Sequence, residues 1–256
     1  MNEIEIFPVC AFNDNYIWTL RQDGKAAVVD PGDAAPVLDY LRAEKLELTA
    51  ILNTHHHADH VGGNAELLSH YRVPVYGPHD ERIPTVSHRL REGDRFTLAH
   101  FGIEFSIFEI PGHTRSHIAF YGSDMLFCGD TLFACGCGRL FEGTPQQMYT
   151  SLAKLAALPD PTRVYCGHEY TLANIRFARA AESENPELVR WEREASAQRA
   201  KNEATLPSSI GREKRANPFL RCDQPAVIAS ASRHVGKPLK DAVSVLGAIR
   251  DWKNNF

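Results

Sequence analysis

The sequence predicts an α/β protein of the α+β kind, with mixed strands and helices followed by a small all-helical C-terminal domain. Over the first 170 residues, short apolar stretches with strand character are separated by turn signals and helical segments. After Tyr170 the apolar residues recur at helical spacing instead. We therefore expect one domain at residues 1–170 and a second at residues 171–256.

The N-terminal region begins with three strand-like stretches, at residues 4–11, 16–21 and 26–30. The segments Asn13-Asp14-Asn15 and Asp23-Gly24 between them are turn signals, so we expect antiparallel neighbours. A helical segment follows, in which Val37, Leu38 and Leu41 share one face, and residues 49–53 then form an apolar stretch typical of a buried strand.

The C-terminal region contains signals for helices. Leu172 and Ile175 begin one helix, and Asn185 with Pro186 is a favourable cap and first-turn pair for the next. A last helix is predicted from an apolar stripe. The stripe consists of Val245, Leu246, Ile249 and Trp252.

Composition excludes several classes of protein. The 256 residues are 43% hydrophobic and 23% charged, which is ordinary for a globular protein and excludes collagen-like, disordered and coiled-coil chains. The net charge of −4 gives no basic field for a nucleic acid. No run reaches the ~18 apolar residues of a membrane helix, so we expect no membrane partner.

The expected location is the cytoplasm. The chain opens with acidic residues where a secretory or mitochondrial leader would be basic, and no cleavage pattern follows. Six cysteines are few for this length and do not form a disulfide framework, so we expect reduced thiols.

Potential metal ligands follow four separate apolar stretches. His55 follows residues 51–53, His113 follows residues 107–110 and a Pro-Gly turn, Asp130 follows residues 125–128, and His168 follows residues 164–166. In open α/β sheets, ligands bind beyond the carboxyl ends of strands, where the loops converge. The pattern predicts one shared site.

The densest cluster is His55-His56-His57-Ala58-Asp59-His60. Residues two apart in an extended segment point the same way, so His55 and His57 can share one ion while His56 points elsewhere. Asp59 and His60 lie further round the turn and suit a second ion. Imidazole and carboxylate ligands fit zinc, iron or manganese, and Asp130 is the candidate bridge between two ions.

Other histidines and cysteines give weaker signals. We expect isolated histidines such as His70, His79, His88, His100 and His234 to lie at the surface or in the core without a metal. Cys135 and Cys137 form a lone C-x-C in a glycine-rich loop, which favours a structural role over redox or soft-metal chemistry.

The H-x-H-x-D-H pattern, together with His113, Asp130 and His168, resembles the metallo-β-lactamase superfamily. The resemblance implies a four-layer αββα sandwich over residues 1–170 with a dinuclear site at its edge. It implies one metal on His55, His57 and His113, a second on Asp59, His60 and His168, and Asp130 as the bridge. His117 follows Thr114-Arg115-Ser116, where many relatives have glycine just before the second histidine, and is expected to be a supporting or structural residue.

Three further segments are similar to glyoxalase II, the hydroxyacylglutathione hydrolase family. They are the stretch from Cys128 to Thr144, the stretch from Gly167 to Asn174, and the terminal Arg250-Asp251-Trp252-Lys253. The resemblance then covers the whole chain. It implies that Arg139, Phe141, Tyr170, Arg250 and Lys253 bind substrate, although Phe141 lacks the hydroxyl that some members carry as tyrosine.

The resemblance implies a metal-dependent thioester hydrolase, which is the second enzyme of methylglyoxal detoxification. The expected reaction converts S-D-lactoylglutathione, or another S-(2-hydroxyacyl)glutathione, and water to glutathione and D-lactate or the corresponding 2-hydroxy acid. Two divalent ions, zinc by preference with iron or manganese as alternatives, would activate the water, and Asp59 would orient it and accept its proton. We expect a monomer.

Other enzymes of the same fold stay as alternatives. A lactonase is one alternative. A β-lactamase should carry an export signal, and a nuclease should carry an extended basic surface. A mononuclear iron enzyme that oxidises glutathione persulfide has no need of Asp59 and His60. A module with a structural zinc ion would have a closed, cysteine-rich site.

Overall fold

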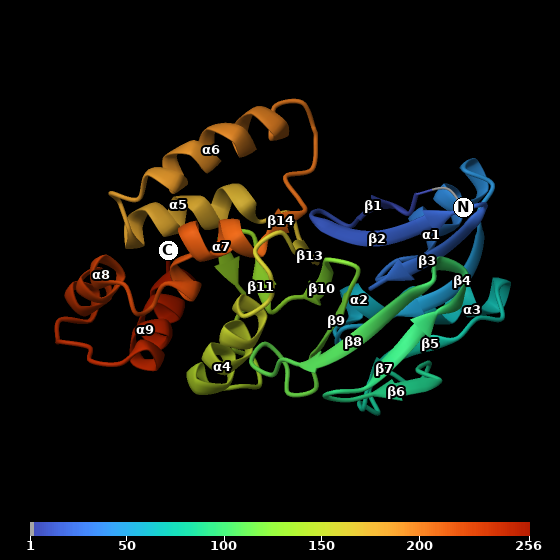
Figure 1. Cartoon of the computed structure of the whole chain (residues 1–256), viewed down its shortest axis with the longest axis horizontal. Helices are drawn as coiled ribbons and strands as arrows, with labels where there is room; N and C mark the ends of the chain where they lie inside the picture. Colours follow the sequence, from blue (N-terminus) through green and yellow to red (C-terminus); the bar gives the residue numbers. More distant parts are fainter. Residues whose placement is uncertain (1–2) are drawn as a thin grey trace. The chain divides into compact units, whose positions relative to one another are not determined.

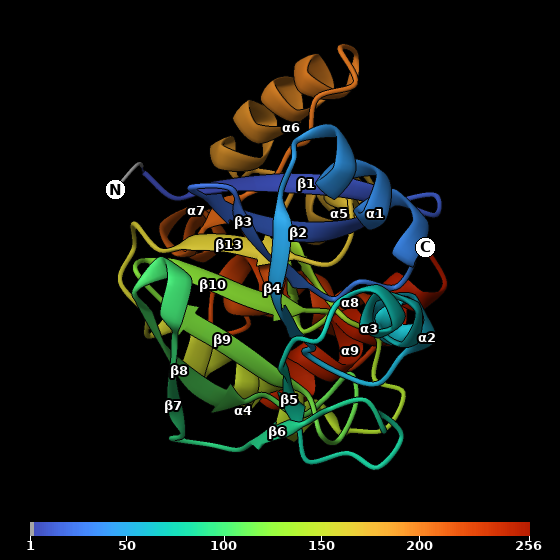
Figure 2. The same ribbon diagram turned by 90° about the vertical axis from the view of Figure 1, so that its right-hand side faces the viewer.

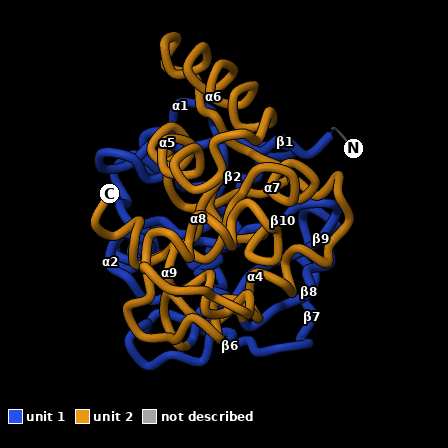
Figure 3. The backbone as a smooth tube through the Cα atoms, turned by 90° about the vertical axis from the view of Figure 1, so that its left-hand side faces the viewer, with its two compact units in different colours: residues 1–109, 116–129 blue, residues 110–115, 130–256 orange. Residues whose placement is uncertain are grey.

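The computed structural model describes residues 3–256, which form two compact units (Figure 3). Unit 1 comprises residues up to 109 together with 116–129, and unit 2 comprises residues 110–115 and 130–256. The strands β1 to β10 belong to unit 1, and the helices α4 to α9 belong to unit 2 (Figure 1).

The first sheet of unit 1 has the strand order β1-β2-β3-β4-β5-β6. Strands β1, β2 and β3 are antiparallel because short turns join them, whereas β4 runs parallel to β3 because helix α1 crosses between them. The elements of this part are β1 (Glu5–Ala11), β2 (Asn15–Gln22), β3 (Lys25–Val29), α1 (Ala34–Ala43), β4 (Glu47–Leu52), α2 (Ala58–Val61), α3 (Asn64–His70), β5 (Val75–Pro78) and β6 (His88–Leu90).

Helices α1 and α3 cover one face of this sheet (Figure 2). Val37 and Leu41 of α1 and Leu67 of α3 are buried against inward side chains such as Val28 and Ile51. This burial removes apolar surface from water, which is the main stabilising contribution of the layer.

A second sheet of unit 1 contains four antiparallel strands in the order β10-β9-β8-β7. Its elements are β7 (Arg95–Leu98), the 3-10 turn η1 (Ala99–Phe101), β8 (Ile103–Glu109), β9 (Ile118–Gly122) and β10 (Met125–Gly129). Phe96 of β7 stacks on Tyr76 of β5 with ring centroids 4.1 Å apart, so the two sheets of unit 1 pack face to face.

Unit 2 consists of helices around two short strand pairs. Its elements are β11 (Leu132–Phe133), β12 (Gly136–Cys137), α4 (Pro145–Ala156), β13 (Arg163–Cys166), α5 (Thr171–Ala181), α6 (Pro186–Arg199), β14 (Ser208–Ser209), α7 (Ile210–Ala216), η2 (Pro218–Leu220), α8 (Pro225–Val235) and α9 (Ala242–Asn254).

The secondary-structure predictions are confirmed within one or two residues. Asn185 caps α6 through its side chain, and Pro186 occupies the first turn. The predicted stripe of α9 is buried at Val245, Leu246 and Ile249, while Trp252 is half-buried. Among the described residues, no helix combines the length and apolar character needed to cross a membrane.

Candidate metal centre

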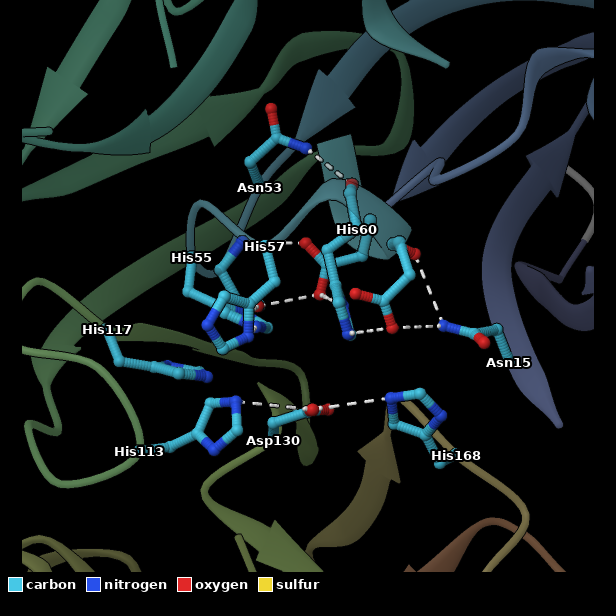
Figure 4. Close-up of polar contacts among 12 residues, drawn as sticks. Asn15, Asn53, His55, His57, His60, His113, His117, Asp130 and His168 are labelled. Carbon is cyan, nitrogen blue, oxygen red and sulfur yellow. Dashed lines mark hydrogen bonds and ion pairs between the residues drawn. The ribbon is translucent and has the colours of Figure 1, made fainter. Parts of the chain in front are cut away.

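Unit 1 supplies the cluster that follows β4. His55 lies three residues after the strand, His57 is the N-cap of α2, and Asp59 and His60 lie within that short helix. His55 and His60 are buried, whereas His57 and Asp59 are partly exposed. The ring atom Nε2 of His55 is 3.1 Å from Nδ1 of His57, so two imidazoles present nitrogens to one point, as the spacing predicts (Figure 4).

Hydrogen bonds fix the tautomer of His55. The Thr54 hydroxyl donates to Oδ2 of Asp30 at 2.6 Å, so its oxygen accepts from Nδ1–H of His55 at 3.0 Å. Nε2 of His55 is then left with a lone pair. That is the form in which a histidine binds metal, and the second ring nitrogen is held by a neighbour in the usual way.

His60 and Asp59 are oriented by residues from other strands. Nδ1 of His60 lies 3.1 Å from Oδ2 of Asp30, which leaves Nε2 of His60 directed towards Oδ2 of Asp59 at 3.5 Å. Nδ2 of Asn15 donates to the same Asp59 oxygen at 3.0 Å (Figure 4). Ligand atoms of Asp30, His55 and His60 lie within 4.8 Å of one another.

Glycine allows this close packing of loops. A Cβ at Gly32 would lie 1.9 Å from the carbonyl oxygen of Asp59, and one at Gly63 would lie 2.7 Å from that of Pro31. Gly129 has a φ of +46°, and a Cβ there would lie 2.2 Å from the Thr54 hydroxyl oxygen. Only glycine fits at these contacts, so the loop after β3 can approach the histidine cluster.

His56 and His117 have supporting roles. Nδ1 of His56 faces Oδ2 of Asp80 at 3.6 Å, while its ring packs edge-on to that of His57 at 4.8 Å. Burial of Asp80 alone would raise its pKa, but hydrogen bonds from Arg82 and Ser116 hold that pKa below its usual range. His117 is buried and stacks on His55 at 4.6 Å, which agrees with the predicted structural role.

Unit 2 brings together the other three predicted ligands. Oδ2 of Asp130 lies 3.5 Å from Nε2 of His113 and 3.3 Å from Nε2 of His168 (Figure 4). All three side chains are largely buried. Nδ1 of His113 is 2.9 Å from the carbonyl oxygen of Arg139, which can only accept a hydrogen bond, so Nδ1 carries the proton and Nε2, which faces Asp130, carries the lone pair.

The donor chemistry of both clusters fits divalent metal ions. Each cluster consists of imidazole and carboxylate groups, which bind zinc, iron and manganese. His55, His60 and His113 each have Nδ1 hydrogen-bonded and Nε2 directed at another ligand group. The residues present therefore suit a metal.

The predicted substrate residues all lie in unit 2. Arg139 is exposed, and Phe141 is 63% exposed with its ring edge-on to His113. Tyr170 is half-buried and stacks on His168 at 4.7 Å with nearly parallel rings. The rings of Phe141 and Tyr170 thus contact predicted ligands, whereas Arg139 contacts His113 through its backbone carbonyl.

Arg250 and Lys253 differ from simple surface charges. Arg250 is only 4% exposed, and its Nη1 donates to the carbonyl oxygen of Cys137 at 2.7 Å. Lys253 donates to Oδ1 of Asn174. Burial and the positive charge of Arg250 lower the pKa of Lys253 to about 8, so this lysine titrates close to neutral pH.

Sequence reasoning missed Asp30, Thr54 and Asn15. Asp30 follows the buried strand β3 with a φ of +53°, and a carboxylate directly after an apolar strand is the same signal that identified Asp130. Thr54 and Asn15 have no such local signal. Thr54 bonds to Asp30, which is 24 residues away, and Asn15 bonds to Asp59, which is 44 residues away.

Comparisons with known proteins cover the whole chain. Residues 12–168 match the family model of the metallo-β-lactamase superfamily, and residues 169–256 match that of the hydroxyacylglutathione hydrolase C-terminus. A hydroxyacylglutathione hydrolase of Nitrosomonas eutropha is 57% identical over 253 residues, which is 99% of each chain.

Solved structures have the same fold. The crystal structure of BLEG-1, a B3 metallo-β-lactamase, is 25% identical with a TM-score of 0.64, covering 85% of this chain and 99% of its own. A protein crystallised in a di-iron-bound form is 28% identical with a TM-score of 0.61, covering 84% and 100%. With the family models, these likenesses confirm the predicted sandwich followed by a helical C-terminal region.

Proposed function

Because the chain belongs to the hydroxyacylglutathione hydrolase family of the metallo-β-lactamase superfamily, we propose that its two ligand clusters form one dinuclear centre for thioester hydrolysis. The enzyme is a glyoxalase II, which converts S-(2-hydroxyacyl)glutathione and water to glutathione and a 2-hydroxy acid. The substrate we assign is S-D-lactoylglutathione, and the product is D-lactate. The observation that carries the proposal is that His55, His60 and His113 each have Nδ1 hydrogen-bonded and Nε2 directed at another proposed ligand.

The proposed ligand sets follow the sequence pattern. His55, His57 and His113 would hold one ion, Asp59, His60 and His168 would hold the other, and Asp130 would be the ligand common to both. The hydrogen bonds to His55, His60 and His113 support this, since each leaves Nε2 with its lone pair. We assign zinc, with iron or manganese as alternatives, and the related protein solved in a di-iron-bound form supports a two-metal site.

When bound, the ions supply Lewis acidity, which lowers the pKa of a water towards about 7 and polarises the thioester carbonyl. Asp59 would orient this water and accept its proton, and Asn15 donates to Asp59 and fixes the carboxylate. A thiol with a pKa of about 8.5 leaves as thiolate without a strong general acid, so no further carboxylate is required.

The proposed glutathione site lies in unit 2. The carboxylates of glutathione need fixed cations, and Arg139, Arg250 and Lys253 supply them. Tyr170 and Phe141 line the same site, because they pack on His168 and His113 respectively. Arg250 is buried, so its guanidinium is already oriented before substrate binds.

We assign catalysis to residues 1–170 and substrate binding to residues 171–256, a division supported by the junction of the two family models at residues 168 and 169. We also assign a monomer with no nucleic-acid or membrane partner, since every proposed site residue comes from one chain. A cytoplasmic location is supported by six cysteines that form no disulfide.

Substrate profiling with metal analysis tests the function. The purified protein is assayed with S-D-lactoylglutathione, a β-lactam and a phosphodiester, and its zinc, iron and manganese contents are measured in parallel. We expect hydrolysis of the thioester only, with two equivalents of metal per chain. Preferential hydrolysis of the β-lactam or phosphodiester would overturn the substrate assignment, and full turnover with one equivalent would overturn the dinuclear centre.

A further inference from the structure

A short hairpin in unit 2 connects Asp130 with Arg139. Strands β11 and β12 pair at Leu132 with Cys137 and at Phe133 with Gly136, so Ala134 and Cys135 form the turn. Cys135 has a φ of +59°, a left-handed conformation that is unfavourable for a residue other than glycine. The hairpin therefore needs contacts from outside to hold this shape.

Side chains of the C-terminal helices supply these contacts. Oε2 of Glu213 accepts from the Cys135 N–H at 2.9 Å, and Nδ2 of Asn217 donates to the carbonyl oxygens of Phe133 at 3.3 Å and Gly136 at 2.9 Å. Asn174 donates to Ala134 at 2.8 Å, and Arg250 donates to Cys137. We call Asn174, Glu213, Asn217 and Arg250 the hairpin clamp.

Glu213 and Asn217 are fully buried and bonded to each other. Nδ2 of Asn217 donates to Oε2 of Glu213 at 2.9 Å, and Ser208 donates to Oε1. Burial raises the pKa of Glu213 to about 7, although three donors face its oxygens. A carboxylate is costly in such a place, and apolar packing alone would not require one.

The far end of the hairpin contacts the predicted ligands. Gly138 donates to the Thr131 carbonyl at 3.2 Å, and a Cβ at Gly138 would lie 2.0 Å from the carbonyl oxygen of Asp130. The backbone carbonyl of the next residue, Arg139, accepts a hydrogen bond from Nδ1–H of His113. The position of the hairpin thus determines where the acceptor for His113 lies.

We propose that Glu213 and Asn217 are positioning residues for His113: through the hairpin they place the Arg139 carbonyl, which accepts from Nδ1–H of His113 and so sets the tautomer in which Nε2 can bind metal. This inference rests on the proposed metal centre. Helix α7 and its C-cap Asn217 thereby influence metal binding, although neither contributes a proposed metal ligand. This role also explains the buried carboxyl group, because a directed hydrogen bond from the Cys135 N–H to Glu213 stabilises the left-handed turn.

The first test is histidine NMR on the metal-free full-length protein at a pH of about 8.5, where ordinary imidazoles are neutral. The His113 signal is assigned by its absence from His113→Ala. We expect the Nδ1–H tautomer in the wild type, and a tautomeric mixture in Glu213→Leu. Leu188→Ala removes a buried side chain of α6 and is the matched control for lost packing, and it should keep the tautomer.

The second test is titration with Zn²⁺ against a chelator of known affinity. We expect Glu213→Leu to weaken zinc binding about 10- to 100-fold, as is typical when the hydrogen-bond partner of a ligand is lost. Glu213→Gln keeps an oxygen for Cys135 and Asn217, so it should bind zinc nearly as the wild type does. Should Glu213→Leu not fold, Asn217→Asp carries the test, because it removes the donors to Phe133 and Gly136.

The proposal is overturned if Glu213→Leu and Leu188→Ala lose the same thermal stability and also show the same tautomer signals and zinc affinities. Zinc binding by Glu213→Gln that is as weak as in Glu213→Leu would also overturn the proposal, since the hydrogen bond to the Cys135 N–H would then not be the cause. The proposed function fails separately, through a wild-type protein that does not hydrolyse S-D-lactoylglutathione.

Discussion

Asp30 and His60 are joined through Oδ2 and Nδ1 at 3.1 Å, although Asp30 lies outside every ligand motif in the sequence. The same carboxylate accepts hydrogen bonds from the hydroxyl and the backbone N–H of Thr54, at 2.6 and 2.7 Å. Because the Thr54 hydroxyl in turn accepts from Nδ1–H of His55, Asp30 also sets the tautomer of His55. One buried carboxylate therefore orients a histidine of each proposed ligand set. Replacing Asp30 should therefore weaken the binding of both proposed ions.

Asp30→Asn should weaken metal binding about 10- to 100-fold, because the amide can no longer accept from both Thr54 and His60. Chelator competition measures this effect. Asp39→Asn on the exposed side of α1 is the control and should bind metal normally. Unchanged affinity in Asp30→Asn would show that the histidine tautomers are set by the metal alone.

Asp130→Ala and His57→Ala should lose metal and reduce turnover to the background rate, because each removes a ligand that no neighbour can replace. Elemental analysis and the thioester assay are measured on the same samples. His100→Ala changes an exposed histidine and should leave both unchanged. Turnover retained by Asp130→Ala would contradict its role as the bridge.

Deprotonation of Lys253 should make kcat/KM fall at alkaline pH, which gives the pH profile an alkaline limb. The folded-state pKa is lowered to about 8, so the ammonium is charged below pH 8 and neutral above it. The value of kcat/KM for a glutathione thioester should then fall as pH rises through 8, by up to about tenfold per pH unit.

Lys253→Arg stays charged throughout this range and should lose the limb, whereas Lys253→Met should raise KM about 10- to 100-fold at neutral pH. An identical limb in Lys253→Arg would assign it to another group.

Phe141→Tyr should lower KM for S-D-lactoylglutathione by about two- to tenfold, which is the usual value of one added hydrogen bond. The ring is 63% exposed beside His113, so a hydroxyl fits without repacking. Phe256→Tyr, at an equally exposed ring on the chain end, controls for general polarity. If KM does not respond, the Phe141 ring lies outside the glutathione site.

Gly138→Ala should destabilise the protein by about 1–3 kcal/mol, because the new methyl group would collide with the Asp130 carbonyl oxygen. Thermal unfolding measures the loss, and metal content should fall with it. Gly247→Ala is the contrast, since it lies within α9 with its nearest neighbour at 3.3 Å and alanine favours a helix. Equal stability of the two variants would show that the hairpin can move away from Asp130.

The strand and helix order was predictable from the sequence because apolar periodicity and turn residues are local signals. The ligand candidates were predictable for the same reason: His55, His57, Asp59 and His60 are contiguous, and Asp130 and His168 each follow an apolar stretch directly. The spacing also predicted that His56 points away, and it does so towards Asp80. These inferences need only the geometry of an extended segment.

Tertiary structure decided which groups hold those ligands in place. Asp30 reaches Thr54 across 24 residues, and Glu213 reaches Cys135 across 78, distances at which no periodicity connects two positions. Burial of Arg250 against the Cys137 carbonyl is a property of the packed helices as well. The sequence by itself determined the types and local spacing of the candidate ligands, whereas their tautomer, orientation and charge state depend on hydrogen bonds that exist only once distant segments have packed.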